Sequence, residues 1–124
     1  MSARIGLENG YSTTASVVAA LDWVISIDYV DIISMSLSEP EEGYTFDPLE
    51  QITNIGVQQG KIILTSSGND GKNDLNLYQL GSPSSSPEVI SVGSSNNIDT
   101  PASFSSRGPT YDCLLYTSPS PRDS

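Results

Sequence analysis

The chain has 124 residues, of which 36% are hydrophobic, and 15 acidic against 5 basic residues give it a formal net charge of −10. This length allows one domain, and the charge disfavours nucleic acid and anionic membranes as partners, because both would be repelled. The longest uninterrupted apolar run, Val17 to Leu21, is far shorter than the roughly 20 residues of a membrane-spanning helix.

The chain contains no histidine and a single cysteine. Histidine is the commonest general base and the commonest zinc ligand, so any catalytic hypothesis must account for its absence. One cysteine cannot form an internal disulfide, and the residues after Met1 lack the apolar stretch of a secretory signal. The composition therefore leaves the cellular compartment open.

The segment 12–27 is predicted to be an amphipathic helix. Val17 and Leu21 begin an apolar pattern at three- and four-residue spacing. Three polar residues are candidates for its N-cap: Ser12, Thr13 and Thr14. Residues 29–37 follow as a short run rich in β-formers, which predicts a strand buried on both faces.

A charged segment with Pro and Gly at 39–43 is predicted to be a solvated loop. A second helix is expected to start at Asp47, with Pro48 in its first position and Glu50 closing a capping box. Gly60 is expected to end it.

Residues 61–66 predict a second buried strand, followed by the loop 67–71. Strand, helix and strand in this order form a βαβ unit, which makes the two strands parallel. Residues 88–93 predict a third strand, and 94–109 are rich in turn residues, with Phe104 as the one large apolar anchor. The predicted fold class is therefore α/β, a partial doubly wound parallel sheet with flanking helices.

The last residues, 113–124, do not fit this pattern. Their sequence from Cys113 onward resembles the translation of a transposase-type sequencing adapter, and we expect a non-native tail there. The alternative is a natural tail rich in Ser and Pro. The domain prediction is therefore a single partial domain over 1–112.

Ligands of open parallel sheets bind outside the carboxyl ends of the strands. Two segments of mostly small and polar residues follow the first two strands. They are Ser36, Leu37 and Ser38 in the first segment, and Ser66, Ser67, Gly68 and Asn69 in the second. Taken alone, such residues are more often turn formers than ligands, so the edge is a candidate site and no more at this point.

The segment Thr65 to Gly71, preceded by an aliphatic strand, resembles the part of subtilisin-like serine peptidases that carries the oxyanion asparagine. Residues 33–38 are similar to the substrate-binding strand of that family. Two further stretches resemble the region that leads towards the nucleophile: Ser82 to Gly93 and Ala102 to Thr110. These blocks occur in the family's order, so the chain is identified as a member of it.

The resemblance implies a role for each candidate residue. Asn69 would be catalytic, by donating its side-chain amide to the oxyanion of the tetrahedral intermediate. Substrate would pair with Ser36, Leu37 and Ser38, and the opposite wall of the pocket would comprise Ser66, Ser67 and Gly68. Ser38 stands where the family usually has Gly, so its hydroxymethyl group is expected to intrude on the pocket or to shift its rim.

The family's catalytic Asp, His and Ser motifs are absent from this sequence. In the family's order, residues 1–112 would lie between the His and the Ser. The chain is thus expected to be an internal fragment of a serine endopeptidase acting on proteins or peptides, and to be inactive alone. The longer protein is expected to be secreted and to need no cofactor.

Calcium is expected only as a structural ion of that longer protein, near Asp112 and the backbone carbonyls of Ser84, Ser86 and Val89. Two other functions stay open. A relative that has lost its triad would bind peptides without cleaving them. A nucleotide or phosphate binder would use the loop 67–71 as an anion cradle, although no phosphate-binding motif is present.

Overall fold

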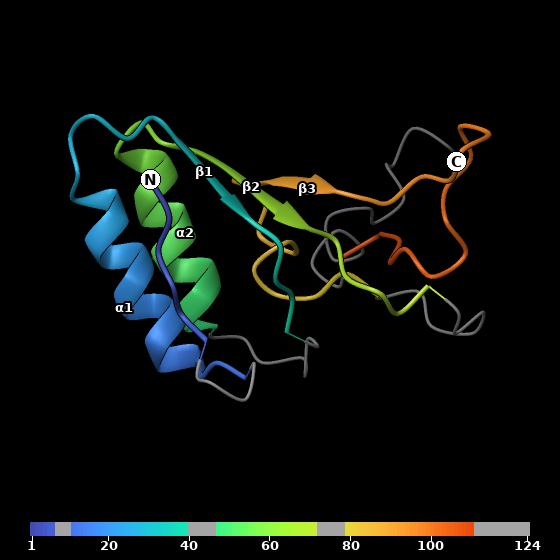
Figure 1. The fold of residues 1–124 in the computed structure, drawn as a ribbon, viewed down its shortest axis with the longest axis horizontal. Helices are drawn as coiled ribbons and strands as arrows, with labels where there is room; N and C mark the ends of the chain where they lie inside the picture. The colour runs from blue at the N-terminus through green and yellow to red at the C-terminus, as the bar shows by residue number, and fades with distance from the viewer. Residues whose placement is uncertain (7–10, 40–46, 72–78, 111–124) are drawn as a thin grey trace, which may run out of the picture.

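The computed structural model describes residues 1–6, 11–39, 47–71 and 79–110. Its helices and strands in chain order are α1 (Thr14–Ile25), β1 (Ile32–Met35), α2 (Pro48–Gln58), β2 (Ile62–Ser66) and β3 (Ile90–Val92) (Figure 1). The strands form a parallel sheet in the order β1-β2-β3, and α1 and α2 lie together on one side of it (Figure 1). This arrangement confirms the predicted α/β class.

Helix α1 begins at a capping box. The Thr13 hydroxyl accepts from the Ser16 N–H at 3.2 Å, and the Ser16 hydroxyl accepts from the Thr13 N–H at 3.1 Å. Both bonds provide acceptors for N–H groups at the start of the helix, which have no acceptor within the helix itself. From there, Val17, Leu21 and Ile25 recur every four residues and form the buried stripe of the helix.

Helix α2 starts and stops where expected. The Asp47 side chain accepts from the Leu49 N–H at 2.8 Å, Pro48 opens the helix, and Gly60 follows its end with a φ of +91°. The capping box expected at Glu50 is wrong. The Glu50 carboxylate instead accepts from the Ser85 hydroxyl at 2.5 Å, because a distant segment of the chain supplies a donor there.

The sheet is covered by helices on one face only within the described residues. Register pairs Ile32 with Ile62 and Ile33 with Ile63, so each pair shares a face. Ile33 and Ile63 are 7% and 1% exposed, whereas Ile32 and Ile62 are 61% and 49% exposed. The prediction of strands buried on both faces is therefore wrong, since α1 and α2 cover the same side.

One aliphatic core holds the two helices against the sheet. Its members are Val17, Leu21, Ile25, Ile33, Leu49, Ile52 and Ile63. Gly56 lets α2 approach closely, because a Cβ there would lie 2.9 Å from a methyl of Ile25 and from one of Ile63. None of the helices in the described ranges has the length and apolar character needed to cross a membrane.

The turn-rich stretch after β3 differs from its prediction in one respect. Phe104, expected to anchor it, is 41% exposed, while Ala102, Ser105 and Ser106 are buried. Backbone contacts explain this: the Gly71 N–H donates to the Phe104 carbonyl and the Ser106 N–H to the Gly68 carbonyl. The stretch is thus held by hydrogen bonds to the loop after β2.

The predicted loop 39–43 beyond Glu39, and the tail 113–124, lie outside the described residues.

Candidate functional site

The segments that follow β1 and β2 meet at one edge of the sheet. Because the two strands are parallel and paired in register, they end on the same side (Figure 1). The Ser66 hydroxyl donates to the Leu37 carbonyl at 3.1 Å. A Cβ built on Gly68 would lie 3.1 Å from the Ser38 Oγ. The structure therefore brings together the two groups of residues that the sequence placed in the site.

Asn69 has an exposed side chain on a loop whose backbone is held on both sides. On one side the Ser106 N–H donates to the Gly68 carbonyl at 3.1 Å, and on the other the Asp70 N–H donates to the Ser106 hydroxyl at 3.0 Å. Gly68 itself has a φ of +104°, a conformation that favours glycine. The Asn69 amide is thus available to a ligand while its backbone is fixed.

Ser66 and Ser67 point in different directions. Ser66 is half-buried and its hydroxyl contacts the first segment, as described above. Ser67 is buried, and its Oγ lies 3.4 Å from the Ser105 Oγ. The Ser67 N–H donates to the Val92 carbonyl at 2.9 Å, so Ser67 holds the second wall against β3 while its hydroxyl faces the interior.

A third segment, Gly81-Ser82, connects the two walls. Glu39 and Ser82 exchange two backbone hydrogen bonds of 2.9 Å, and the Gly81 N–H donates to the Ser67 carbonyl at 3.4 Å. Gly81 has no role in the sequence-based prediction. Its position could have indicated a role, because Gly81 directly precedes Ser82-Pro83, the start of one of the blocks that resemble the family.

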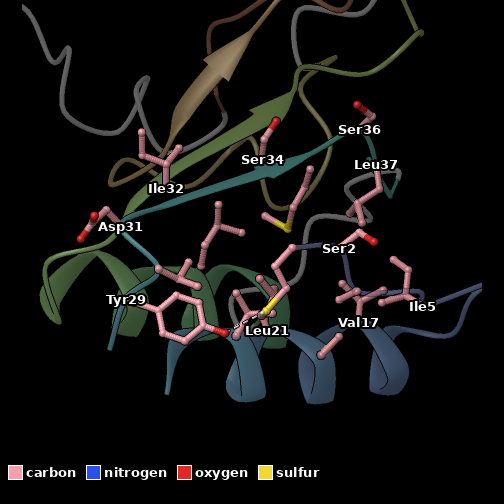
Figure 2. Close-up of a pocket in the computed structure, with 17 residues that line it drawn as sticks. Ser2, Ile5, Val17, Leu21, Tyr29, Asp31, Ile32, Ser34, Ser36 and Leu37 are labelled. Atoms are coloured by element: carbon pink, nitrogen blue, oxygen red, sulfur yellow. Dashed lines mark hydrogen bonds between the residues drawn. The ribbon is translucent and has the colours of Figure 1, made fainter. Parts of the chain in front are cut away.

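An apolar groove of about 700 Å³ lies between α1, β1 and the first residues of the chain. Figure 2 shows Leu37 turned towards Ile5 and Val17 at one end of this groove, while Ser36 points to the opposite side. The alternation is that of an extended backbone. Leu37 thus links the candidate site to the groove.

The described ranges contain no cluster of three or more His, Cys, Asp or Glu side chains that could hold a metal ion. The calcium expectation depends on Asp112, which lies outside those ranges. It stays a prediction.

Comparison with known proteins identifies the family. The model of the subtilase family matches residues 1–118. The serine protease AprX of Bacillus subtilis is 32% identical over 119 residues, covering 83% of this chain and 26% of that protein. A subtilisin of Bacillus pumilus is 32% identical over 98 residues, covering 79% of this chain and 34% of its own length.

The chain belongs to the subtilase family, as its motifs indicate. It spans about a quarter to a third of the length of these relatives. A solved structure of the prenylagaramide maturation protease PagA has a similar fold, with a TM-score of 0.69 over 86% of this chain and 37% of that one, at 22% identity.

Proposed function

We propose that this chain supplies the oxyanion donor and the substrate-binding walls of a subtilisin-like serine endopeptidase, a longer protein that provides the triad. Membership of the subtilase family supports the reaction class, serine-type peptide hydrolysis. The observation that carries the finer assignment is the exposed Asn69 side chain, on a clamped loop beside the segment that contains Ser38.

Asn69 acts when the scissile carbonyl is attacked. The carbonyl oxygen then gains negative charge, and a side-chain N–H aimed at it stabilises the transition state more than the ground state. In a subtilisin, loss of such a donor is known to lower kcat by about 10²–10³, and a loss of the same order is expected for Asn69 in the longer protein. The two bonds around Ser106 contribute by fixing the loop before reaction, so that less reorganisation is needed.

The substrate chain binds in an extended form. Ser36, Leu37 and Ser38 continue beyond β1, which is the outer strand of the sheet in the described residues. An outer strand has backbone groups free to pair with an added strand. Ser66, Ser67 and Gly68 form the other wall. The substrate is a protein or peptide, which is consistent with the net charge of −10 disfavouring nucleic acid.

The isolated chain is proposed to bind peptides without cleaving them. It contains no histidine, so no serine in it has the usual activating base. Purified chain should release no fluorescence from labelled casein and should not react with a fluorophosphonate probe. Measurable cleavage or labelling that survives further purification would contradict this part of the proposal.

Peptide binding is tested by titrating the ¹⁵N-labelled full chain with a blocked tetra-alanine amide and recording ¹H–¹⁵N NMR spectra. We expect the chemical shift changes to concentrate at 36–38 and 66–69. The same peptide made of D-residues is the matched control, because its backbone cannot pair with an L-strand in the same way. Shift changes spread over α1 and α2, or equal for both peptides, would contradict the proposed site.

A secreted location and a structural calcium ion are proposed for the longer protein only, on the basis of the family resemblance. Both can be checked there, by locating the protein in cell fractions and by comparing its Tm with and without a calcium chelator. An intracellular location contradicts the first, and an unchanged Tm contradicts the second.

A further inference from the structure

We propose that Ser38 restricts the peptide residue immediately before the scissile bond to one with a small side chain: glycine, alanine or serine. This inference rests on the proposed function, since it assumes that a peptide occupies the edge between the two walls. It adds the chemical class of substrate that this particular edge accepts.

The position of that peptide residue follows from Asn69. The carbonyl that Asn69 holds belongs to the residue before the scissile bond, so this residue lies beside the loop 67–69. Gly68 directly precedes Asn69, and the Ser38 Oγ lies 3.1 Å from where a Cβ on Gly68 would be. The side chain in question therefore enters the space between Gly68 and Ser38.

The Ser38 hydroxyl already occupies much of this space. A Cβ built on Gly81 would overlap both the Ser38 Oγ and the Glu39 carbonyl oxygen. The hydroxyl thus extends from the first wall to Gly68 on one side and to Gly81 on the other. Both neighbours are glycines, and the Ser106 Oγ, 2.8 Å from where a Cβ on Gly68 would be, narrows the same space further.

The segment Gly81-Ser82, which lies against the Ser38 hydroxyl, is also held in place. Ser82 is 2% exposed and its backbone is paired with Glu39 in both directions. The Gly81 carbonyl accepts from the Ser84 hydroxyl at 2.9 Å, and its N–H donates to the Ser67 carbonyl at 3.4 Å. Moving this segment away from Ser38 to admit a large side chain would break several of these bonds.

The consequence is selection by size. Rotation about the Ser38 Cα–Cβ bond moves the hydroxyl but leaves Cβ in place. Forcing a large peptide side chain into this packed space is unfavourable, because the surrounding atoms would have to shift. The inference is therefore that a side chain the size of a methyl group is accepted beside Ser38 and an aromatic side chain is not.

The test uses the full chain and two blocked tetrapeptide amides, which have three alanines followed by either Ala or Phe. Dissociation constants come from the NMR titration. We expect the Ala peptide to bind at least about 10-fold more tightly than the Phe peptide, since filling or missing a pocket changes discrimination by about 10- to 200-fold. Ser38→Gly should improve binding of the Phe peptide by about 10-fold and change the Ala peptide by less than about 2-fold.

Two further variants keep the result interpretable. Ser38→Ala retains Cβ and removes the hydroxyl, so its preference should lie between those of the wild type and Ser38→Gly. Ser26→Gly makes the same change at an exposed serine beyond the far end of α1 and should leave both affinities unchanged. Equal affinity of the wild type for the Ala and Phe peptides would overturn the inference alone. Failure of both peptides to bind would overturn the proposed function.

Discussion

The helical layer and the carboxyl edge of the sheet differ in what they bury. Between the helices and the sheet the buried side chains are aliphatic. Around the candidate site they are mostly serines: Ser67, Ser82, Ser84, Ser85, Ser86, Ser105 and Ser106. Aliphatic burial stabilises in proportion to area, whereas a hydrogen-bonded hydroxyl contributes little net free energy and instead fixes geometry. Within the described residues, all of these serines except Ser82 have such a bond through their hydroxyl. One region therefore holds the chain together, and the other gives the binding edge its shape.

The largest expected effect comes from the covered face of the sheet. Ile63→Ala should lower the free energy of unfolding by about 2–5 kcal/mol, because it leaves a cavity in the core. Ile62→Ala, its neighbour on the open face, should cost less than about 1 kcal/mol. Urea unfolding followed by circular dichroism measures both. Equal losses of stability in the two variants would show that the open face is also packed, which would contradict the difference between the two faces of the sheet.

The next effect tests the shape of the edge. A Cβ on Gly71 would overlap the Ser105 carbonyl, so Gly71→Ala should force the two loops apart and cost about 1–3 kcal/mol. Gly6→Ala is the matched control, since the nearest atom to its Cβ, the Tyr11 carbonyl oxygen, is 3.9 Å away. The Tm of the two variants gives the comparison. A similar Tm for both would contradict the close approach of the loops.

A smaller effect is expected where the two regions meet. The Ser86 hydroxyl donates to the Asn54 Oδ1 at 2.6 Å and so ties the serine-rich segment to α2. Ser86→Ala should cost about 1.5 kcal/mol, the upper part of the range for one hydrogen bond. A double-mutant cycle with Asn54→Ala isolates the pair, and additive losses would mean that the bond contributes nothing.

The smallest effect concerns the start of α2. Asp47→Ala should cost about 1 kcal/mol, because the Leu49 N–H loses its acceptor. Asp47→Asn should be close to neutral, since Asn caps equally well. Helicity and urea midpoints of the two variants test this. A large loss in Asp47→Asn would indicate a role for the charge beyond capping.

The helices could be predicted from the sequence because their signals are local. Thr13 was among the candidate caps of α1, and Asp47, Pro48 and Gly60 bound α2 as predicted. Burial was harder to predict, because an aliphatic residue such as Ile62 has the same sequence signal whether or not a helix covers it. Glu50 and Phe104 were mispredicted for a similar reason. Their partners come from segments far away in the sequence.

The motifs predicted which residues form the candidate site. How these residues contact one another is visible only in the structure. The proximity of the two walls followed from parallel strands ending at one edge. The contribution of Gly81 could not follow, because a glycine carries no side-chain signal and its place depends on the pairing of Glu39 with Ser82. Likewise, only the structure shows that Ser67 turns inward.

The central claim is that the Asn69 amide holds a negatively charged oxygen. It is tested most directly with a tripeptide that ends in an aminoalkyl phosphonate, whose charged oxygens imitate the oxyanion without needing a nucleophile. The matched amide peptide lacks that charge. Asn97→Ala, a change at another exposed asparagine, controls for general effects.

The measurement is the affinity of each peptide for the wild type and for Asn69→Ala, by NMR titration. Hydrogen bonds to charged groups contribute about 1.5–3 kcal/mol. We therefore expect Asn69→Ala to weaken phosphonate binding by about 10-fold or more and to change amide binding by less than about 2-fold. Equal affinity of wild type and Asn69→Ala for the phosphonate would contradict the account.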